Sequence, residues 1–264
     1  GDVTNVDTIS VYGSNNLVGM NGGVGLNTTG TVLQINNDGT TQSMTESQYD
    51  AFGGSITGDD FNTNDTVQIW TGNIQSITTD KDVERYVFQD DTGNNEISVT
   101  LVNPDENSTV TIESDVPGDT IIIDASALPA GKTLKLVGSA QFVITGLSGD
   151  LDASESTGSL TVTSNGGNTI TTGMGNTHVT SNGGSTAINA EMMRDANNIN
   201  VPTTTSLLTT DGTGSVVITN LVADLDNSAT GGATVTMGSD DLAGFAYLPG
   251  VDVTLVSTTA ITVA

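Results

Sequence analysis

The chain alternates apolar and polar residues over short stretches, and glycine or asparagine separates one stretch from the next. Examples are residues 31–35 (TVLQI), 66–70 (TVQIW), 97–102 (ISVTLV) and 160–163 (LTVT). A period of two places the apolar side chains on one side of a β-strand, and threonine, valine and isoleucine favour strands. The pattern predicts an all-β protein built from many short strands joined by tight turns.

One segment has a helical pattern instead. In residues 45–52 (TESQYDAF), Thr45 is placed to act as the N-cap and Gln48 follows three residues later. This spacing is typical of a capping box, and the glycines at 53 and 54 stop a helix. We expect a helix of at most about two turns here.

Internal repetition indicates how the strands are arranged. Residues 143–154 (VITGLSGDLDAS) align with residues 217–228 (VITNLVADLDNS), 74 residues later. Residues 188–190 (INA) repeat the Leu-Asp-Ala step halfway between them, which gives a period of 37. Residues 123–126 (IDAS) open the series 28 residues before the step that begins at residue 151. Solenoid repeats have roughly 20 to 30 residues or fewer per turn. Each 37-residue unit therefore predicts about two rungs of a parallel β-solenoid, similar to a β-helix or β-roll.

A finer repeat lies between these copies, where a glycine-containing turn recurs every eight or nine residues through residues 166–188. In the Ca²⁺-binding nonapeptide of a β-roll, an aspartate follows the glycines. Asn168, Asn176 and Ser185 stand near that place here. The spacing favours a β-roll-like geometry, but the charged ligand is missing.

The first hundred residues contain alternating stretches without this repeat. We therefore expect a boundary near residue 105. Residues 1–104 are predicted to form a β-rich N-terminal region that is sandwich-like or irregular, and residues 105–264 the repetitive β-solenoid.

The chain is strongly acidic, with 31 Asp and Glu residues against five Lys and Arg and a formal net charge of −26. Nucleic acids and anionic lipid surfaces attract basic proteins, so neither is an expected partner. No apolar run approaches the roughly 18 to 20 residues that span a bilayer, so membrane insertion is not expected. Divalent cations or a saline medium must offset the repulsion between carboxylates, which indicates a secreted protein.

Two carboxylate pairs are the main candidate metal ligands. Asp150 and Asp152 flank one leucine, and Asp224 and Asp226 flank another, so each pair lies on one face of a strand or one lip of a turn. If such pairs stack in register, they converge on shared Ca²⁺ ions, with backbone carbonyls completing the coordination. The alternative is that these aspartates are turn residues with solvated carboxylates.

Other acidic positions extend this set of candidates. Asp124 belongs to the copy at residues 123–126, and Asp90 and Asp91 open an oxygen-rich loop that does not match an EF-hand. His178 is the sole histidine and has no second histidine or nearby serine with which to form a nucleophilic pair. We therefore do not expect an enzyme. A polysaccharide hydrolase is the remaining enzymatic alternative, and the scarcity of basic residues argues against an acidic substrate.

The repeat also resembles a known group of proteins. Residues 147–163 (LSGDLDASESTGSLTVT) and 188–190 resemble the β-strand repeats of large bacterial surface proteins related to repeats-in-toxin adhesins and S-layer proteins. Residues 44–52, followed by Asp60 and residues 65–69, are similar to another module of such proteins. The resemblance implies export by a dedicated secretion route, Ca²⁺-promoted folding outside the cell, and lateral or end-to-end assembly. It implies no catalytic residue.

The C-terminal segment indicates a partner. Residues 251–264 have a strand pattern and no polar cap, and an uncapped solenoid end pairs with another strand. We expect a head-to-tail or lateral homopolymer, as in the structural subunit of an S-layer, sheath or extracellular fibre. A cell-surface polysaccharide is a further candidate partner. The alternative function is a stalk or ligand-binding module of a large secreted adhesin.

Overall fold

The structure of the protein is a computed structural model. It describes residues 8–11, 14–16, 32–35, 41–45, 48–49, 56–57, 65–70, 76–79, 83–89, 96–102, 109–193, 206–221, 223–235 and 253–254. In this part of the chain, β-strands are joined by turns and short connections, and only Gln48 and Tyr49 are helical. The all-β prediction is confirmed. Within the same residues, no helix is long and apolar enough to cross a membrane.

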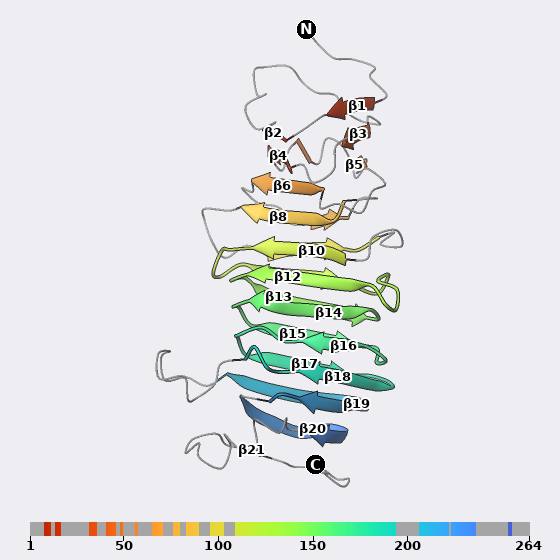
Figure 1. Ribbon diagram of the computed structural model, residues 1–264, viewed down its shortest axis with the longest axis vertical. Coiled ribbons are helices and arrows are strands. Elements are labelled where there is room, and N and C mark those ends of the chain that lie inside the picture. Colours follow the sequence, from red (N-terminus) through yellow and green to blue (C-terminus); the bar gives the residue numbers. More distant parts are fainter. Residues whose placement is uncertain are drawn as a thin grey trace.

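Every strand pair in the described part of the chain is parallel. The strands stack one above another along the longest axis of the molecule, with β1 (Thr8–Val11) and β20 (Asp224–Val235) toward opposite ends (Figure 1). From β6 to β17 each strand pairs with the strand two positions along in sequence. The chain therefore winds as a parallel β-solenoid with two strands per rung, which confirms the predicted fold class.

The even-numbered strands form one face of the solenoid, called here the even face. Its members are β2 (Asn15–Asn16), β4 (Thr41–Thr45), β6 (Thr66–Trp70), β8 (Arg85–Gln89), β10 (Thr109–Ser114), β12 (Thr133–Gly138), β14 (Asp150–Ser156), β16 (Thr169–Thr171) and β18 (Ser185–Asn189). The odd face comprises β7 (Ser76–Thr78), β9 (Glu96–Thr100), β11 (Thr120–Asp124), β13 (Gln141–Leu147), β15 (Leu160–Ser164) and β17 (Thr177–Ser181).

Two long strands connect the faces. The first part of β19 (Leu207–Thr219) pairs with β17 on the odd face, and its last part pairs with β18 on the even face. β20 follows β19 along both parts, and β21 (Val253–Thr254) then pairs with the odd-face part of β20. β21 lies within the C-terminal segment for which the sequence predicts a strand.

The strand ladders run through residue 105, where the sequence predicts a boundary. β8 pairs with β10, and β9 pairs with β11, both in parallel. Farther toward the N-terminus, β4, β6 and β8 continue the even face, and β1, β3 (Val32–Ile35) and β5 (Ile56–Thr57) form a separate parallel sheet. The described N-terminal strands are thus solenoid strands and not the antiparallel layers of a sandwich. The division into domains 1–104 and 105–264 stays a prediction.

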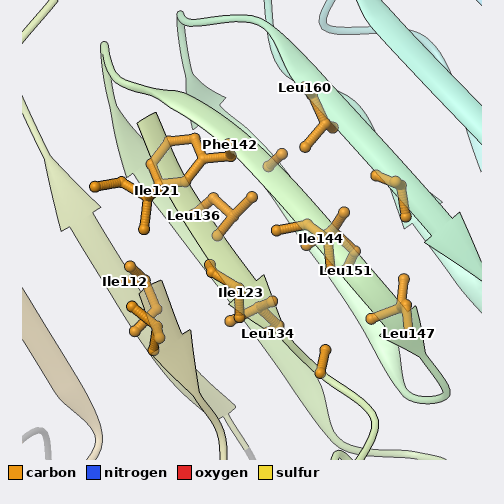
Figure 2. Packing of buried hydrophobic residues seen from close by; sticks show 14 of the residues in the cluster. Ile112, Ile121, Ile123, Leu134, Leu136, Phe142, Ile144, Leu147, Leu151 and Leu160 are labelled. Carbon is orange, nitrogen blue, oxygen red and sulfur yellow. The ribbon is translucent and has the colours of Figure 1, made fainter. Parts of the chain in front are cut away.

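The core lies between the two faces. Inward side chains stack on those of the next rung, as in the odd-face series Ile97, Ile121, Phe142 and Leu160. Side chains such as Leu136 of the even face meet these from the opposite side (Figure 2). All five are at most 2% exposed. Alternation along each strand therefore provides one continuous apolar interior.

The 37-residue repeat corresponds to two rungs where the register is regular. Leu151 pairs with Ile170, and Ile170 pairs with Ile188, which lies 37 residues after Leu151. The next copy behaves differently, because Leu225 pairs with Leu208 on the odd face. Equivalent segments of the two longer copies therefore occupy opposite faces. Both faces need the same alternation of inward and outward residues, so either can accept the unit.

The segment that begins at Thr45 has the predicted capping box. The backbone N–H of Thr45 donates to Gln48 Oε1 at 2.8 Å, and the N–H of Gln48 donates to Thr45 Oγ1 at 3.3 Å. This reciprocal capping box is the one that the sequence predicts.

Elsewhere, glycine is required at corners where rungs approach closely. Gly138 has a φ of 106°, and a Cβ there would lie 2.2 Å from the Ser114 carbonyl oxygen.

Candidate functional site

Asp150 and Asp152 lie on β14, on the even face. Their neighbours in the preceding rung are Thr133 and Lys135, and Thr171 follows Asp152 in the next rung. No second aspartate pair stands above or below them in register. The cation beside Asp152 is a lysine of the chain itself.

Asp224 and Asp226 lie on the odd-face part of β20. Their register partners are Leu207 and Thr209, and Thr254 follows Asp226 on the other side. The two Asp-Leu-Asp pairs therefore lie on opposite faces of the solenoid, and the expected convergence of stacked pairs does not occur. Within the described residues, no group of three or more His, Cys, Asp or Glu side chains is arranged to hold a metal ion. The assignment of these aspartates as Ca²⁺ ligands stays a prediction.

The aspartates of the repeat have a local structural role. The backbone N–H of Ser126 donates to Asp124 Oδ1 at 3.0 Å, and the N–H of Ser154 donates to Asp152 Oδ1 at 3.0 Å. Both are Asx turns, in which a short side chain accepts a hydrogen bond from the backbone two residues on. The Asp-Ala-Ser sequence thus recurs where a strand ends or bends.

At Asp152 this turn coincides with a β-bulge. Lys135 pairs with Asp152, but Val137, two residues later, pairs with Glu155, three residues later. The second copy repeats the irregularity, because pairing there passes from Asp226 to Ala229 while the opposite strand advances by only two residues. A bulge leaves one residue outside the ladder, and at Asp152 the carboxylate provides the acceptor for the N–H of Ser154.

Asp150 links two rungs instead. Its Oδ1 accepts a hydrogen bond from the N–H of Thr169, the first residue of β16, at 2.8 Å. Asp124, Asp150 and Asp152 therefore each use one carboxylate oxygen as a backbone acceptor. Asp90 and Asp91, the remaining predicted ligands, lie outside the described residues.

The even face carries its own charge compensation. The Arg85 guanidinium pairs with the Glu113 carboxylate, and Lys135 Nζ lies 2.6 Å from Glu155 Oε1. Each pair joins adjacent rungs, because β8 pairs with β10 and β12 pairs with β14. Opposite charges on neighbouring strands stabilise a sheet weakly when they are exposed. Arg85 and Lys135 thus offset carboxylates locally on this face.

His178 lies on the outer side of β17 and is half-exposed. Its Nε2 is 3.1 Å from Asp211 Oδ2 and 3.4 Å from Thr180 Oγ1. Both contacts use the same ring nitrogen. A catalytic triad uses the two nitrogens separately, one to accept a proton from the nucleophile and one to bond to the acid. This group therefore lacks triad geometry. The Asp211 partner is 33 residues away, and local sequence spacing does not indicate it.

The sequence also gave no indication of a buried polar corner. Ser164 Oγ donates to Asn168 Oδ1 at 2.8 Å and lies 2.9 Å from Thr186 Oγ1, which is 3.0 Å from Ser181 Oγ. Ser164, Ser181 and Thr186 are fully buried. Asn168 also donates to the Leu147 carbonyl at 3.2 Å. Asn168, which stands near the place of the Ca²⁺-binding aspartate of a β-roll repeat, is therefore an interior hydrogen-bonding residue.

Comparisons with protein-family models, curated proteins and solved structures found no match. The resemblance to repeats-in-toxin adhesins and S-layer proteins thus stays a prediction.

Proposed function

We propose that the chain is a structural subunit of an extracellular surface assembly such as an S-layer, sheath or fibre. The observation that supports this proposal is the parallel ladder, which encloses one interior from rung to rung. Its polar groups serve the fold, since the repeated aspartates bond to backbone N–H groups and the interior hydroxyls bond to one another. A repetitive body of this kind provides length and stiffness.

Self-association follows as the expected partner interaction. Stacked rungs expose backbone donors and acceptors at a solenoid end, and a head-to-tail contact generates an open filament. We test it with the purified chain by light scattering and negative-stain microscopy over a range of concentrations. Filaments or sheets support a subunit function. A monomeric rod at all concentrations contradicts it and favours the adhesin stalk, which a glycan-binding assay then examines.

Two variants distinguish the modes of assembly. Pro substitution at both Val253 and Thr254 removes the backbone donors of β21, whereas Thr161→Lys adds charge to an exposed position on the odd face. Loss of assembly only in the double proline variant indicates head-to-tail contact. Loss only in Thr161→Lys indicates lateral contact through the odd face.

Ca²⁺ dependence is tested in the same assay. A chelator is added, and Ca²⁺, Mg²⁺ or concentrated NaCl is then restored while circular dichroism follows β-structure. Recovery with Ca²⁺ alone supports specific Ca²⁺ binding. Equal recovery with all three salts shows charge screening, and unchanged structure and assembly throughout contradict the Ca²⁺ prediction.

A further inference from the structure

Two Asn-Gly-Gly turns occupy the same corner in successive rungs. Residues 165–167 connect β15 to β16, and residues 182–184 connect β17 to β18. The turns stack closely, since a Cβ on Gly166 would lie 1.6 Å from the Gly183 carbonyl oxygen. Asn165 and Asn182 are both exposed. The two sites are alike in local sequence and accessibility, so any difference between them comes from the surrounding structure.

An asparagine followed by glycine can react with its own backbone. Because glycine has no side chain, its backbone nitrogen can approach the preceding side-chain amide closely. The reaction needs a mobile amide and a glycine nitrogen that is not held in a hydrogen bond. Hydrogen bonds to either group therefore slow it.

At Asn165, hydrogen bonds hold both the side-chain amide and the nitrogen of the following glycine. Its Nδ2 donates to the Gly146 carbonyl and to Ser148 Oγ, each at 3.0 Å. The N–H of Gly166 donates to Ser164 Oγ at 2.9 Å. The side-chain amide and the attacking nitrogen are both restrained.

Asn182 lacks these restraints. Its backbone N–H donates to the Ser164 carbonyl at 2.9 Å, and its backbone carbonyl accepts from Thr213 Oγ1 at 3.1 Å. Within the described residues, neither its side-chain amide nor the Gly183 N–H makes a hydrogen bond. Ser181 takes the place that Ser164 has in the other turn, and its hydroxyl also contacts Thr186 Oγ1, but within the described residues it accepts no hydrogen bond from the Gly183 N–H. The Gly183 nitrogen is left available.

We propose that Asn182 is a site of spontaneous deamidation and that the fold protects Asn165. The Gly183 nitrogen attacks Asn182 Cγ and forms the new C–N bond, while the bond from Cγ to the amide nitrogen breaks. The Gly183 proton leaves with that nitrogen as ammonia. Water then opens the resulting succinimide at either carbonyl, which gives aspartate or isoaspartate. The reaction needs no oxidant or further reagent.

The modification changes a tightly packed corner. Each event adds one carboxylate, and the isoaspartate product also inserts a methylene into the main chain between β17 and β18. Because Gly183 packs on Gly166, this longer main chain disturbs the stacking of the two rungs. An extracellular protein that persists without replacement accumulates the change with age. The inference does not depend on the proposed function.

The test is incubation of the folded chain in mildly alkaline buffer, followed by digestion and mass spectrometry that separates aspartate from isoaspartate. We expect conversion several-fold faster at Asn182 than at Asn165. In the chain unfolded with urea, both sites should react at similar rates, because their local sequences match. Equal rates in the folded chain, or a difference that persists after unfolding, overturn the proposal.

Two variants make the test specific. Gly183→Ala hinders the attacking nitrogen, and a Cβ there meets only the Asn165 carbonyl oxygen, at 3.2 Å; deamidation at Asn182 should slow several-fold. Ser148→Ala removes one hydrogen bond of the Asn165 amide and should accelerate Asn165 alone. Unchanged rates in both variants, with the fold verified by circular dichroism, contradict the mechanism.

Discussion

The rungs from β10 to β14 and those from β15 to β19 enclose different interiors within one fold. The first group contains buried Ile112, Ile121, Leu136 and Phe142. The second places a connected set of buried hydroxyls in the corner around Ser164. Parallel backbone pairing continues through both. A solenoid rung therefore needs an inward group that matches its neighbours, either by apolar contact or by hydrogen bonding.

The apolar interior and the hydrogen-bonded interior differ in which substitutions they tolerate. An apolar interior loses contacts in proportion to the volume that is removed. A hydrogen-bonded interior instead depends on each buried donor and acceptor keeping its partner. Substitutions in the two regions should thus have different effects on stability.

Phe142→Ala tests the apolar region. Phe142 is 1% exposed and stacks between Ile121 and Leu160. Its truncation leaves a cavity, so the free energy of unfolding should fall by about 3 to 5 kcal/mol. Denaturant titration followed by circular dichroism measures the loss, and Phe142→Leu serves as a control with a much smaller effect. A loss equal to that of the control would show that the interior closes around the missing ring.

Thr186→Val tests the polar corner with almost no change of volume. Its hydroxyl lies 2.9 Å from Ser164 Oγ and 3.0 Å from Ser181 Oγ. Because the substitution deprives two buried hydroxyls of a partner, stability should decrease by about 1 to 3 kcal/mol. The same titration measures it. If Thr186→Val is neutral, hydrogen bonding does not hold this corner together.

Thr210→Val should change stability in the opposite direction in the same region. Thr210 is fully buried on β19, and its hydroxyl has no hydrogen-bond partner in the described part of the structure. Replacing it with an apolar group of the same shape removes a desolvation cost, so stability should rise by about 1 kcal/mol. Thr209→Val, at the adjacent half-exposed position, is the matched control. A loss of stability at Thr210 would reveal a partner for the hydroxyl, such as a buried water.

Much of this fold could be predicted from the sequence. Alternation and glycine spacing indicate short strands, and the 37-residue period corresponds to two rungs at Leu151, Ile170 and Ile188. The parallel N-terminal strands could not be distinguished from a sandwich, because both have a period of two. The opposite faces of the two Asp-Leu-Asp copies also could not be predicted. The length of the connection between β18 and β19 decides which face the second copy reaches. The alternation of inward and outward residues is the same on both faces and does not indicate it.

The candidate site was harder to predict for a related reason. An Asp-x-Ser step suits a metal ligand and an Asx turn equally well, and only the register shows which groups stand beside Asp152. The buried hydroxyl corner depends on contacts such as Ser164 with Thr186, 22 residues apart. Serine and threonine in a glycine-rich segment are typical of exposed turns, so their burial follows only from the winding of the chain.

Asp152→Ala separates a structural aspartate from a metal ligand. Loss of the Oδ1 acceptor leaves the Ser154 N–H without its bond, so stability should fall by about 1 kcal/mol. Asp152→Asn keeps an acceptor oxygen at the same place and should retain most of the stability.

Titrations with Ca²⁺ and with a chelator complete this comparison. In the Asx turn, the loss in Asp152→Ala is the same under both conditions, and Asp124→Ala behaves alike because it removes the same hydrogen bond to Ser126. A bound cation instead requires the negative charge, so Asp152→Asn would fail together with Asp152→Ala, and only when Ca²⁺ is present. That result would support the metal interpretation for this face of the solenoid, where Lys135 is the neighbouring cation.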